Sequence, residues 1–283
     1  MPRFDTPEPI TASIEAGIAY LTIAAGDRAD TVVEIRPTDP NDESDVDAAA
    51  RTTVDLTGGT LTIRGPKYNQ FSFTNKSRSI DVLLELPAGS DLLGKNGMGD
   101  LTATGRLGAV DYKTGLGHIH LDEVGALSVT SSTGNVRGNR VTGRASITTA
   151  SGRLQVGELA EGGVLKNSNG NTVVGAARGP IRVRSANGDI TVEEASGDVE
   201  AKTANGSVRV LDAVRGTLRL DTAMGEIEVG VRAGSAAWLD LTSKFGKVRN
   251  ELTVSGAPEE GVDTLEVHAT TAFGDITARR AER

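Results

Sequence analysis

The fold is decided by residues 187–210, which read NGDITVEEASGDVEAKTANGSVRV. Two Asn-Gly pairs stand 18 residues apart in this stretch, and aliphatic residues occupy the second and fourth positions after each glycine. After Gly188 these are Ile190 and Val192, with polar residues between and beside them. Alternation with a period of two is typical of a β-strand that buries one face, and it differs from the stripe of an amphipathic helix.

The same pattern recurs along most of the chain. Its glycines are spaced 17 to 19 residues apart through Gly225, and two more follow after insertions: Gly99, Gly117, Gly134, Gly152, Gly170, Gly188, Gly206, Gly225, Gly246 and Gly274. A second glycine lies near the middle of most units, so each unit of about 18 residues contains two turns. One such unit cannot bury its apolar face alone, whereas stacked copies form a continuous core. The sequence therefore predicts an all-β fold, a parallel β-solenoid (β-helix) of about ten coils in which Ile190, Val208 and Ile227 lie one above another.

Two further positions recur beside each glycine. A short polar residue stands three positions before it, and we expect these residues to stack at a corner and to bond a neighbouring coil or the turn backbone: Asn96, Thr114, Ser131, Thr149, Asn167, Ser185, Thr203, Thr222, Ser243 and Thr271. The residue directly before the glycine is Asn169, Asn187 or Asn205 in the middle of the series, and we expect these Asn-Gly corners to be positions where a residue adopts a left-handed backbone. Larger apolar residues occupy this position elsewhere, and we expect them to pack at less regular coils: Met98, Leu116, Met224, Phe245 and Phe273.

Residues 1–90 do not follow the unit and are interpreted as an N-terminal β capping segment, with residues 91–283 as the solenoid repeat region. A cap is needed because an open solenoid end is an unpaired strand edge. Within it we expect a short helix near 44–51, a hairpin turn at Gly58-Gly59, and strands over 10–15, 18–24, 31–36, 52–57, 60–64 and 79–86. Near the other end, the insertion at 255–263 is expected to be an exposed loop.

Composition excludes several classes of protein. The formal net charge of −8 argues against a nucleic-acid or anionic-membrane binder, which needs clustered Lys and Arg. The chain has no cysteine, so disulfides and thiolate chemistry are excluded. No stretch reaches the roughly 18 apolar residues of a membrane span, and the first residues lack the apolar run of an export signal. We therefore expect a cytoplasmic protein.

The candidates for a metal or catalytic site are few. His118 and His120 flank Ile119 on an expected strand and leave the same face, but two ligands do not make a metal site, and we interpret them as a solvated strand face. The acidic residues at 39–47 could suggest calcium, yet they lack the glycine and distant glutamate of a calcium loop. A solvated loop that leads into the short helix is the simpler interpretation. We assign no catalytic, cofactor-binding or metal-binding residue and expect no cofactor.

The pattern resembles a known family. Leu84-Glu85-Leu86-Pro87-Ala88-Gly89 leads into repeated Gly-Asp/Asn/Ser units, and Gly274-Asp275-Ile276 closes the series. Over roughly residues 10–280 this is similar to the bacterial β-strand-repeat family of unknown function labelled putative adhesin. The resemblance implies a β-solenoid fold and brings no catalytic residues with it.

Two classes of function compete. The first is a non-catalytic scaffold or adhesin-like module that binds a protein partner, with self-assembly into bactofilin-like filaments as a variant. Uniform coils joined by short turns favour this class, because catalysis needs a walled pocket. The alternative is a carbohydrate-active β-helix enzyme that uses surface acids such as Glu193 or Asp198. Only 3% of the residues are aromatic, Trp238 is the single tryptophan, and Tyr112 falls in an inward position, so platforms for sugars are scarce.

Overall fold

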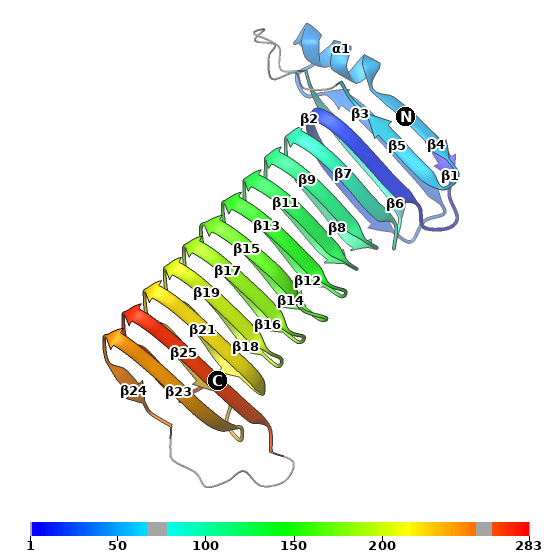
Figure 1. Ribbon diagram of the computed structural model, residues 1–283. Helices are drawn as coiled ribbons and strands as arrows, with labels where there is room; N and C mark the ends of the chain where they lie inside the picture. The colour runs from blue at the N-terminus through cyan, green and yellow to red at the C-terminus, as the bar shows by residue number, and fades with distance from the viewer. Residues whose placement is uncertain (1, 67–77, 253–261, 283) are drawn as a thin grey trace. The chain divides into compact units, whose positions relative to one another are not determined.

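The computed structural model of the protein describes residues 2–66, 78–252 and 262–282. It contains an N-terminal unit, residues 1–139, and a C-terminal unit, residues 140–283. In each unit a coil consists of two strands joined by a tight turn, and equivalent strands of neighbouring coils pair in parallel (Figure 1). The inward side chains of the two rows of strands form the core between them.

The N-terminal unit begins with a mixed β segment and one helix. Its elements are β1 (Arg3–Asp5), β2 (Thr11–Gly26), β3 (Asp30–Pro37), α1 (Glu43–Arg51), β4 (Thr53–Thr57), β5 (Thr60–Arg64) and β6 (Ser79–Pro87). The two strands expected over 10–15 and 18–24 are one continuous strand, β2, because its halves pair in parallel with β5 and β6 on one side and with β7 and β8 on the other. β3 pairs antiparallel with β1 and β6, and β4 pairs antiparallel with β5. Part of residues 1–90 thus extends the parallel stack, and antiparallel strands close it.

The hairpin and the short helix follow local turn and capping chemistry. Gly58 and Gly59 adopt φ of 57° and 75° between β4 and β5, which is the backbone of a tight hairpin turn. Asp42 caps α1, because its side chain accepts the backbone N–H of Ser44 at 2.7 Å.

The N-terminal unit continues with regular coils. They comprise β7 (Asp91–Met98), β8 (Leu101–Leu107), β9 (Val110–Leu116), β10 (Ile119–Val124), β11 (Leu127–Thr133) and β12 (Val136–Val141), the last of which crosses the unit boundary. Tyr112 points inward as expected and is fully buried. Its ring lies over Gly94 of the neighbouring strand, where an added Cβ would stand 2.2 Å from a ring carbon. A glycine opposite the ring therefore makes room for this large aromatic side chain in the core.

The C-terminal unit repeats the coil with little variation. Its strands are β13 (Ala145–Ser151), β14 (Leu154–Leu159), β15 (Gly163–Asn169), β16 (Thr172–Ala177), β17 (Ile181–Asn187), β18 (Ile190–Ala195), β19 (Val199–Asn205), β20 (Val208–Ala213), β21 (Gly216–Met224), β22 (Ile227–Val231), β23 (Ala236–Phe245), β24 (Val248–Asn250), β25 (Thr264–Phe273) and β26 (Ile276–Arg280). Ile190 pairs with Val208, and Val208 pairs with Ile227. All three are at most 1% exposed, so the expected vertical register is confirmed.

The order of the last two coils differs from their order in the sequence. β25 pairs with β21 on one side and with β23 on the other, and β26 lies in the same way between β22 and β24. The expectation that each coil stacks on its predecessor is therefore wrong for this pair. The insertion expected to be a loop, 255–263, lies mostly outside the described residues.

Most of the polar residues three positions before a corner glycine bond a neighbouring coil or the turn backbone, as expected. Asn167 donates through Nδ2 to the carbonyls of Gly152 and Gly170, both at 2.9 Å. Hydroxyls at the equivalent position donate to the turn glycine of the adjacent coil at 2.8 to 3.2 Å, and they belong to Thr203, Thr222, Ser243 and Thr271. Among the described side chains, the hydroxyls of Ser131, Thr149 and Ser185 are buried at this position without a hydrogen-bond partner.

The left-handed backbone expected at the Asn-Gly corners is adopted by the glycine and not by the asparagine. Within the described ranges, Arg78 is the one residue other than glycine with a positive φ. The glycine of the corner takes this conformation instead: Gly188 has φ 138°, and a Cβ there would lie 2.3 Å from the carbonyl oxygen of Gly170. The asparagines form an outward ladder, in which the amide of Asn187 bonds Asn169 at 2.9 Å and that of Asn205 bonds Asn187 at 2.8 Å.

Replacing Val208 by Asp should destabilise the protein severely. Val208 is fully buried between two coils, and an unpaired carboxylate there should lower the free energy of unfolding by at least about 3 kcal/mol. Arg209→Ala is the matched control, because the adjacent Arg209 points outward with long ion pairs of 3.6 and 3.8 Å. It should change stability by less than about 0.5 kcal/mol. Chemical denaturation of both variants measures this, and equal tolerance would contradict the assignment of faces.

Tyr112 should make the protein lose stability at alkaline pH. Burial raises the pKa of Tyr112 to about 12 from 10.0. Because the neutral phenol is favoured in the folded state, its contribution is complete below pH 10 and is lost as the pH rises towards 12. The free energy of unfolding of the wild type should fall by about 2 kcal/mol more than that of Tyr112→Phe over this range. Denaturation curves at several pH values test this, and parallel curves for the two proteins would disprove it.

Candidate binding surface

The most exposed large apolar side chains of the C-terminal unit gather on its last coils. Trp238, Phe245 and Phe273 are 57%, 58% and 55% exposed, and Met224 is 55% exposed. They lie on β21, β25 and β23, and we call the outer side of these three strands the C-terminal face. The expectation that large apolar residues before a glycine pack at irregular coils is wrong, because this position points outward in every coil where they occur.

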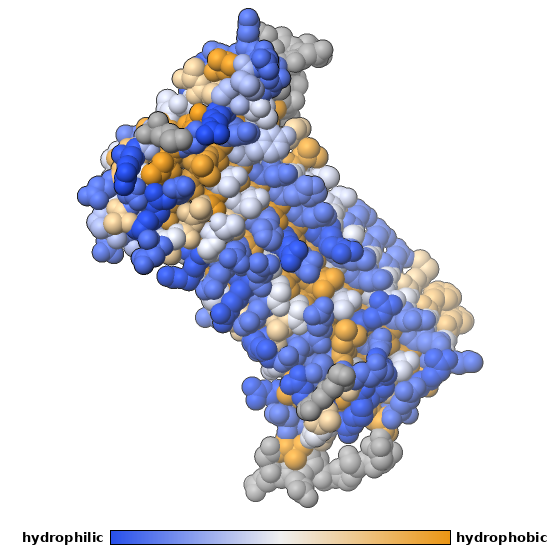
Figure 2. Space-filling view, turned by 180° about the vertical axis from the view of Figure 1, so that it is seen from behind, coloured by the Kyte–Doolittle hydropathy of each residue, from blue (hydrophilic) through white to orange (hydrophobic). Residues whose placement is uncertain are grey.

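One end of the C-terminal face carries an apolar ridge. Met224 pairs with Phe273, and Phe273 pairs with Phe245 on the next strand. The two phenyl rings stack with centroids 4.9 Å apart and planes 14° apart, and Lys244 places Nζ 5.4 Å from the centroid of Phe245. Figure 2 shows orange side chains at the right-hand margin, which corresponds to the arrowhead ends of these strands in Figure 1.

The other end of the same strands carries an aromatic and acidic cluster. Trp238 meets His268 edge to face with ring centroids 5.3 Å apart. The His268 ring contacts two carboxylates, through Nε2 to Glu266 at 2.8 Å and through Nδ1 to Asp240 at 3.4 Å. His268 lies on the outer side of β25 and is half-buried.

A shallow groove of about 930 Å³ runs beside the ridge. Its walls are small residues and its charged side chains are mostly cationic, and it is lined by Arg184, Ser185, Lys202, Thr203, Ala204, Asp221, Thr222, Ala223, Thr242, Lys244, Thr270, Thr271 and Ala272. The alanines leave room above the sheet, and the phenylalanines stand at its border. The C-terminal face therefore offers apolar anchors and charges of both signs, and the groove extends from it onto β17 and β19.

His118 and His120 do not share a strand face as expected, because His118 lies in the turn before β10 and only His120 lies on the strand. The ring of His118 accepts the backbone N–H of Asn135 through Nδ1 at 3.1 Å. The backbone N–H of His118 donates to the carboxylate of Asp100 at 2.7 Å. Side chains at the same position of other coils bond in the same way, for example Asp189 with the N–H of Ser207 at 2.8 Å. His118 thus belongs to a ladder that joins one turn to the next. His120 lies half-buried on β10 opposite Thr102.

The acidic residues at 39–47 include two with structural roles around α1. Asp45 is buried and accepts hydrogen bonds from the backbone N–H and the hydroxyl of Ser79, at 2.7 and 2.9 Å. Asp42 caps the helix, and its hydrogen bonds with Ser44 lower the pKa of its carboxyl. Across residues 2–66, 78–252 and 262–282, no three His, Asp or Glu side chains are grouped so that they could hold a metal ion.

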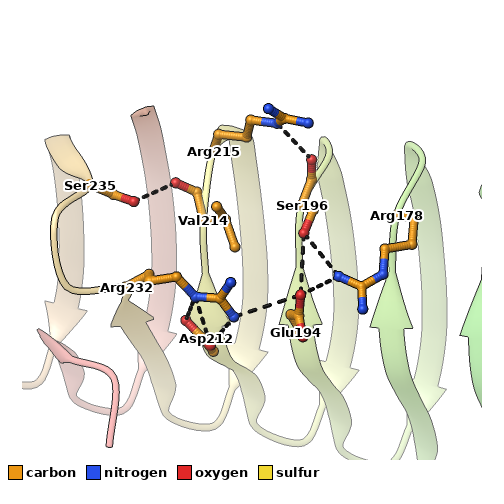
Figure 3. A network of polar contacts seen from close by, with 8 residues as sticks. All are labelled: Arg178, Glu194, Ser196, Asp212, Val214, Arg215, Arg232 and Ser235. Atoms are coloured by element: carbon orange, nitrogen blue, oxygen red, sulfur yellow. Dashed lines mark hydrogen bonds and ion pairs between the residues drawn. The ribbon is translucent and has the colours of Figure 1, made fainter. Parts of the chain in front are cut away.

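A charged network joins neighbouring coils near the C-terminal ends of β16, β18, β20 and β22 (Figure 3). Glu194 lies between Arg178 and Arg232, and Arg232 also pairs with Asp212. The hydrogen bond with Asp212 raises the pKa of Arg232. Each carboxylate of the network is neutralised by a guanidinium, so the network has the arrangement of a clamp between coils rather than of an acid and a base poised for catalysis.

The acids considered for a carbohydrate-active enzyme are placed on the surface. Glu193 is exposed on β18, and Asp198 accepts the backbone N–H of Thr217 at 2.8 Å in a turn.

Sequence reasoning missed the C-terminal face. The available signal was that Phe245 and Phe273 occupy the same position of two coils, which places them side by side once that position is known to point outward.

These observations define a parallel β-solenoid of the strand-repeat class, with a short mixed β segment at its N-terminus. The chain belongs to the Toastrack DUF4097 family, whose family model matches residues 13–279.

Three solved structures are similar over nearly the whole chain. A putative adhesin from Bacteroides fragilis is 14% identical, with a TM-score of 0.32 and coverage of 98% of this chain and 95% of that one. A putative lipid binding protein from Parabacteroides distasonis is 12% identical, with a TM-score of 0.42 and coverage of 99% and 96%. A putative adhesin from Parabacteroides merdae is 10% identical, with a TM-score of 0.33 and coverage of 99% and 95%. A comparison with curated proteins finds no match.

In the part of the chain that the structure describes, no helix has the length and apolarity needed to cross a membrane.

Proposed function

We propose that the protein is a non-catalytic β-solenoid module that binds a protein partner through the C-terminal face. The observation that carries the proposal is the concentration of exposed aromatic side chains there: three of the nine aromatic residues in the chain lie on two neighbouring strands and are more than half exposed. Aromatic anchors dominate the energetics of protein interfaces, whereas single exposed apolar residues are ordinary. Exposure of these aromatic side chains to water is unfavourable, and a partner that covers the face would remove them from water.

The chemistry of the face restricts the partner. Beside the ridge, Arg184, Lys202 and Lys244 outnumber Asp221, so the groove fits a segment that carries apolar side chains next to carboxylates. At the Trp238 end the charges reverse, with Asp240 and Glu266 around His268. A partner that is complementary to both ends would bind in one orientation along the strands.

Catalysis has less support from the geometry. The groove is open and its walls are mainly alanine and threonine, whereas catalysis requires a site that excludes water around a nucleophile or an acid–base pair. Localisation in the cytoplasm and the identity of the partner belong to the same proposal, and both are open to direct measurement in the native host.

Removing the aromatic anchors should abolish partner binding without unfolding the protein. We expect proteins recovered from the native host on the wild type to be lost on Trp238→Ser and on the double variant Phe245→Ser/Phe273→Ser. With a purified partner, each variant should raise the Kd at least about thirty-fold, the size expected for an interface hot spot. Binding can be measured by calorimetry and folding by circular dichroism.

Leu116→Ser is the matched control. Leu116 is 45% exposed and precedes its glycine as Phe245 does, but it lies in the N-terminal unit. It should bind as the wild type does. A partner that binds every variant equally, or whose footprint lies only within residues 2–90, would refute the assignment of the C-terminal face.

A further inference from the structure

β23 leaves one edge of its sheet unpaired. Within the described residues, β25 is the one strand that pairs with it, over Ala236 to Phe245 in a constant register (Figure 1). A ten-residue edge strand is long for a natural protein, and an open edge of this length is a template for another strand.

The backbone groups at this edge can be assigned from one hydrogen bond. The N–H of Ala236 donates to the carbonyl of Asp263 at 2.9 Å, on the side of β25. Because alternate residues of a strand direct their N–H and C=O groups to opposite edges, those of Leu239, Leu241 and Ser243 point to the open edge. Six peptide groups are thereby available to a further strand.

The core is also incomplete at this end. Leu239 and Leu241 are only half-buried, whereas Val267 and Ala269, their neighbours on β25, are at most 1% exposed. In the N-terminal unit, by contrast, β3, β4 and α1 lie beyond the parallel strands β5 and β6. A strand added at β23 would bury apolar surface as well as backbone groups.

We propose that the edge of β23 pairs antiparallel with β23 of a second copy of this chain, in a two-fold dimer centred on Thr242. The charges on the strand are self-complementary in this register. Asp240 and Lys244 are the charged side chains of β23, both are exposed, and they lie two residues on either side of Thr242. Each Asp240 then faces the partner's Lys244, and the two-fold axis forms the pair twice.

The register agrees with the backbone assignment. Leu241 and Ser243 both direct their peptide groups to the edge, and the pairing places Leu241 opposite the partner's Ser243 as a hydrogen-bonded pair. Asp240 and the partner's Lys244 are then a non-hydrogen-bonded pair, with Cα atoms about 4.5 Å apart and side chains closest together. Sliding the strands to centre on Asp240 or on Lys244 would set like charges opposite each other, which is unfavourable.

The pairing closes rather than propagates. A two-fold interface uses the same edge on both copies, so it yields a dimer and leaves no second β23 edge for growth. This goes beyond the proposed function. Asp240 and Lys244 also belong to the C-terminal face, so the dimer is scored by mass on the purified chain alone, where loss of partner binding has no effect on the result.

The dimer can be tested on the full chain by reversing the charge of Asp240 or Lys244 singly and by exchanging the two charges in a double variant. By sedimentation equilibrium, we expect the wild type to have twice the 29.3 kDa mass of one chain. Asp240→Lys and Lys244→Asp should each raise the dimer Kd at least ten-fold, since each sets two like-charged pairs opposite one another. The double variant Asp240→Lys/Lys244→Asp restores opposite charges and should recover the wild-type Kd. Hydrogen exchange should show the amides of Leu241 and Ser243 protected in the dimer and exposed in the single variants.

Lys166→Glu is the control for a change of charge alone. Lys166 is exposed on β15 and lies several coils from the edge, so this variant should remain dimeric. Thermal melts of all variants check that the fold is kept, and partner binding through the C-terminal face is scored separately. A wild type that is monomeric at all concentrations, single variants that remain dimeric, a double variant that does not recover, or assemblies larger than a dimer would each overturn the proposal.

Discussion

The parallel pairing between coils is the interaction on which the rest of this protein depends. A strand can pair with the equivalent strand of the next coil only if both coils have nearly the same length and turn in the same places. The corner glycines show how narrow this requirement is, because the Cβ of any other residue at Gly188 would overlap the carbonyl of Gly170. Polar side chains such as Asn167 and Thr203 then satisfy the carbonyls that the tight corner leaves at the surface of the core. The repeat in the sequence follows from this geometry.

The first coils of the N-terminal unit and the last coils of the C-terminal unit are built differently from the regular coils. At the N-terminus the chain turns to antiparallel pairing, and β3, β4 and α1 follow the last parallel layers. At the C-terminus the final strands in the sequence, β25 and β26, enter between two earlier coils and leave β23 and β24 outermost. The outermost coil consequently carries both the half-buried core residues and the most exposed aromatic side chains of the unit. Features that point to interaction with other molecules are concentrated where the repeat ends.

The regular coils closely resemble one another, and many of their polar side chains bond to a neighbouring coil. The asparagine ladder, the turn ladder that includes His118 and the clamp of Arg178, Glu194 and Arg232 all connect one coil to its neighbour. Residue types that suggest chemistry in an ordinary fold therefore have a structural role here. The C-terminal face differs because its aromatic side chains remain more than half exposed, although Trp238 meets His268 and Phe245 contacts Phe273 and Lys244.

The sequence by itself determined the coil, since a period of about 18 residues with alternating aliphatic positions can bury its apolar side chains in one way, by stacking in register. It also determined which residues point inward, for example Tyr112 and Val208, and where the hairpin at Gly58-Gly59 and the short helix lie, because these depend on local pattern and turn chemistry. Only the tertiary structure decided that β25 lies between β21 and β23, because coils of equal length can pair in either order and no local signal distinguishes them. For the same reason the open edge of β23, and the neighbour that each exposed aromatic residue acquires, became visible only once the coils were placed against one another.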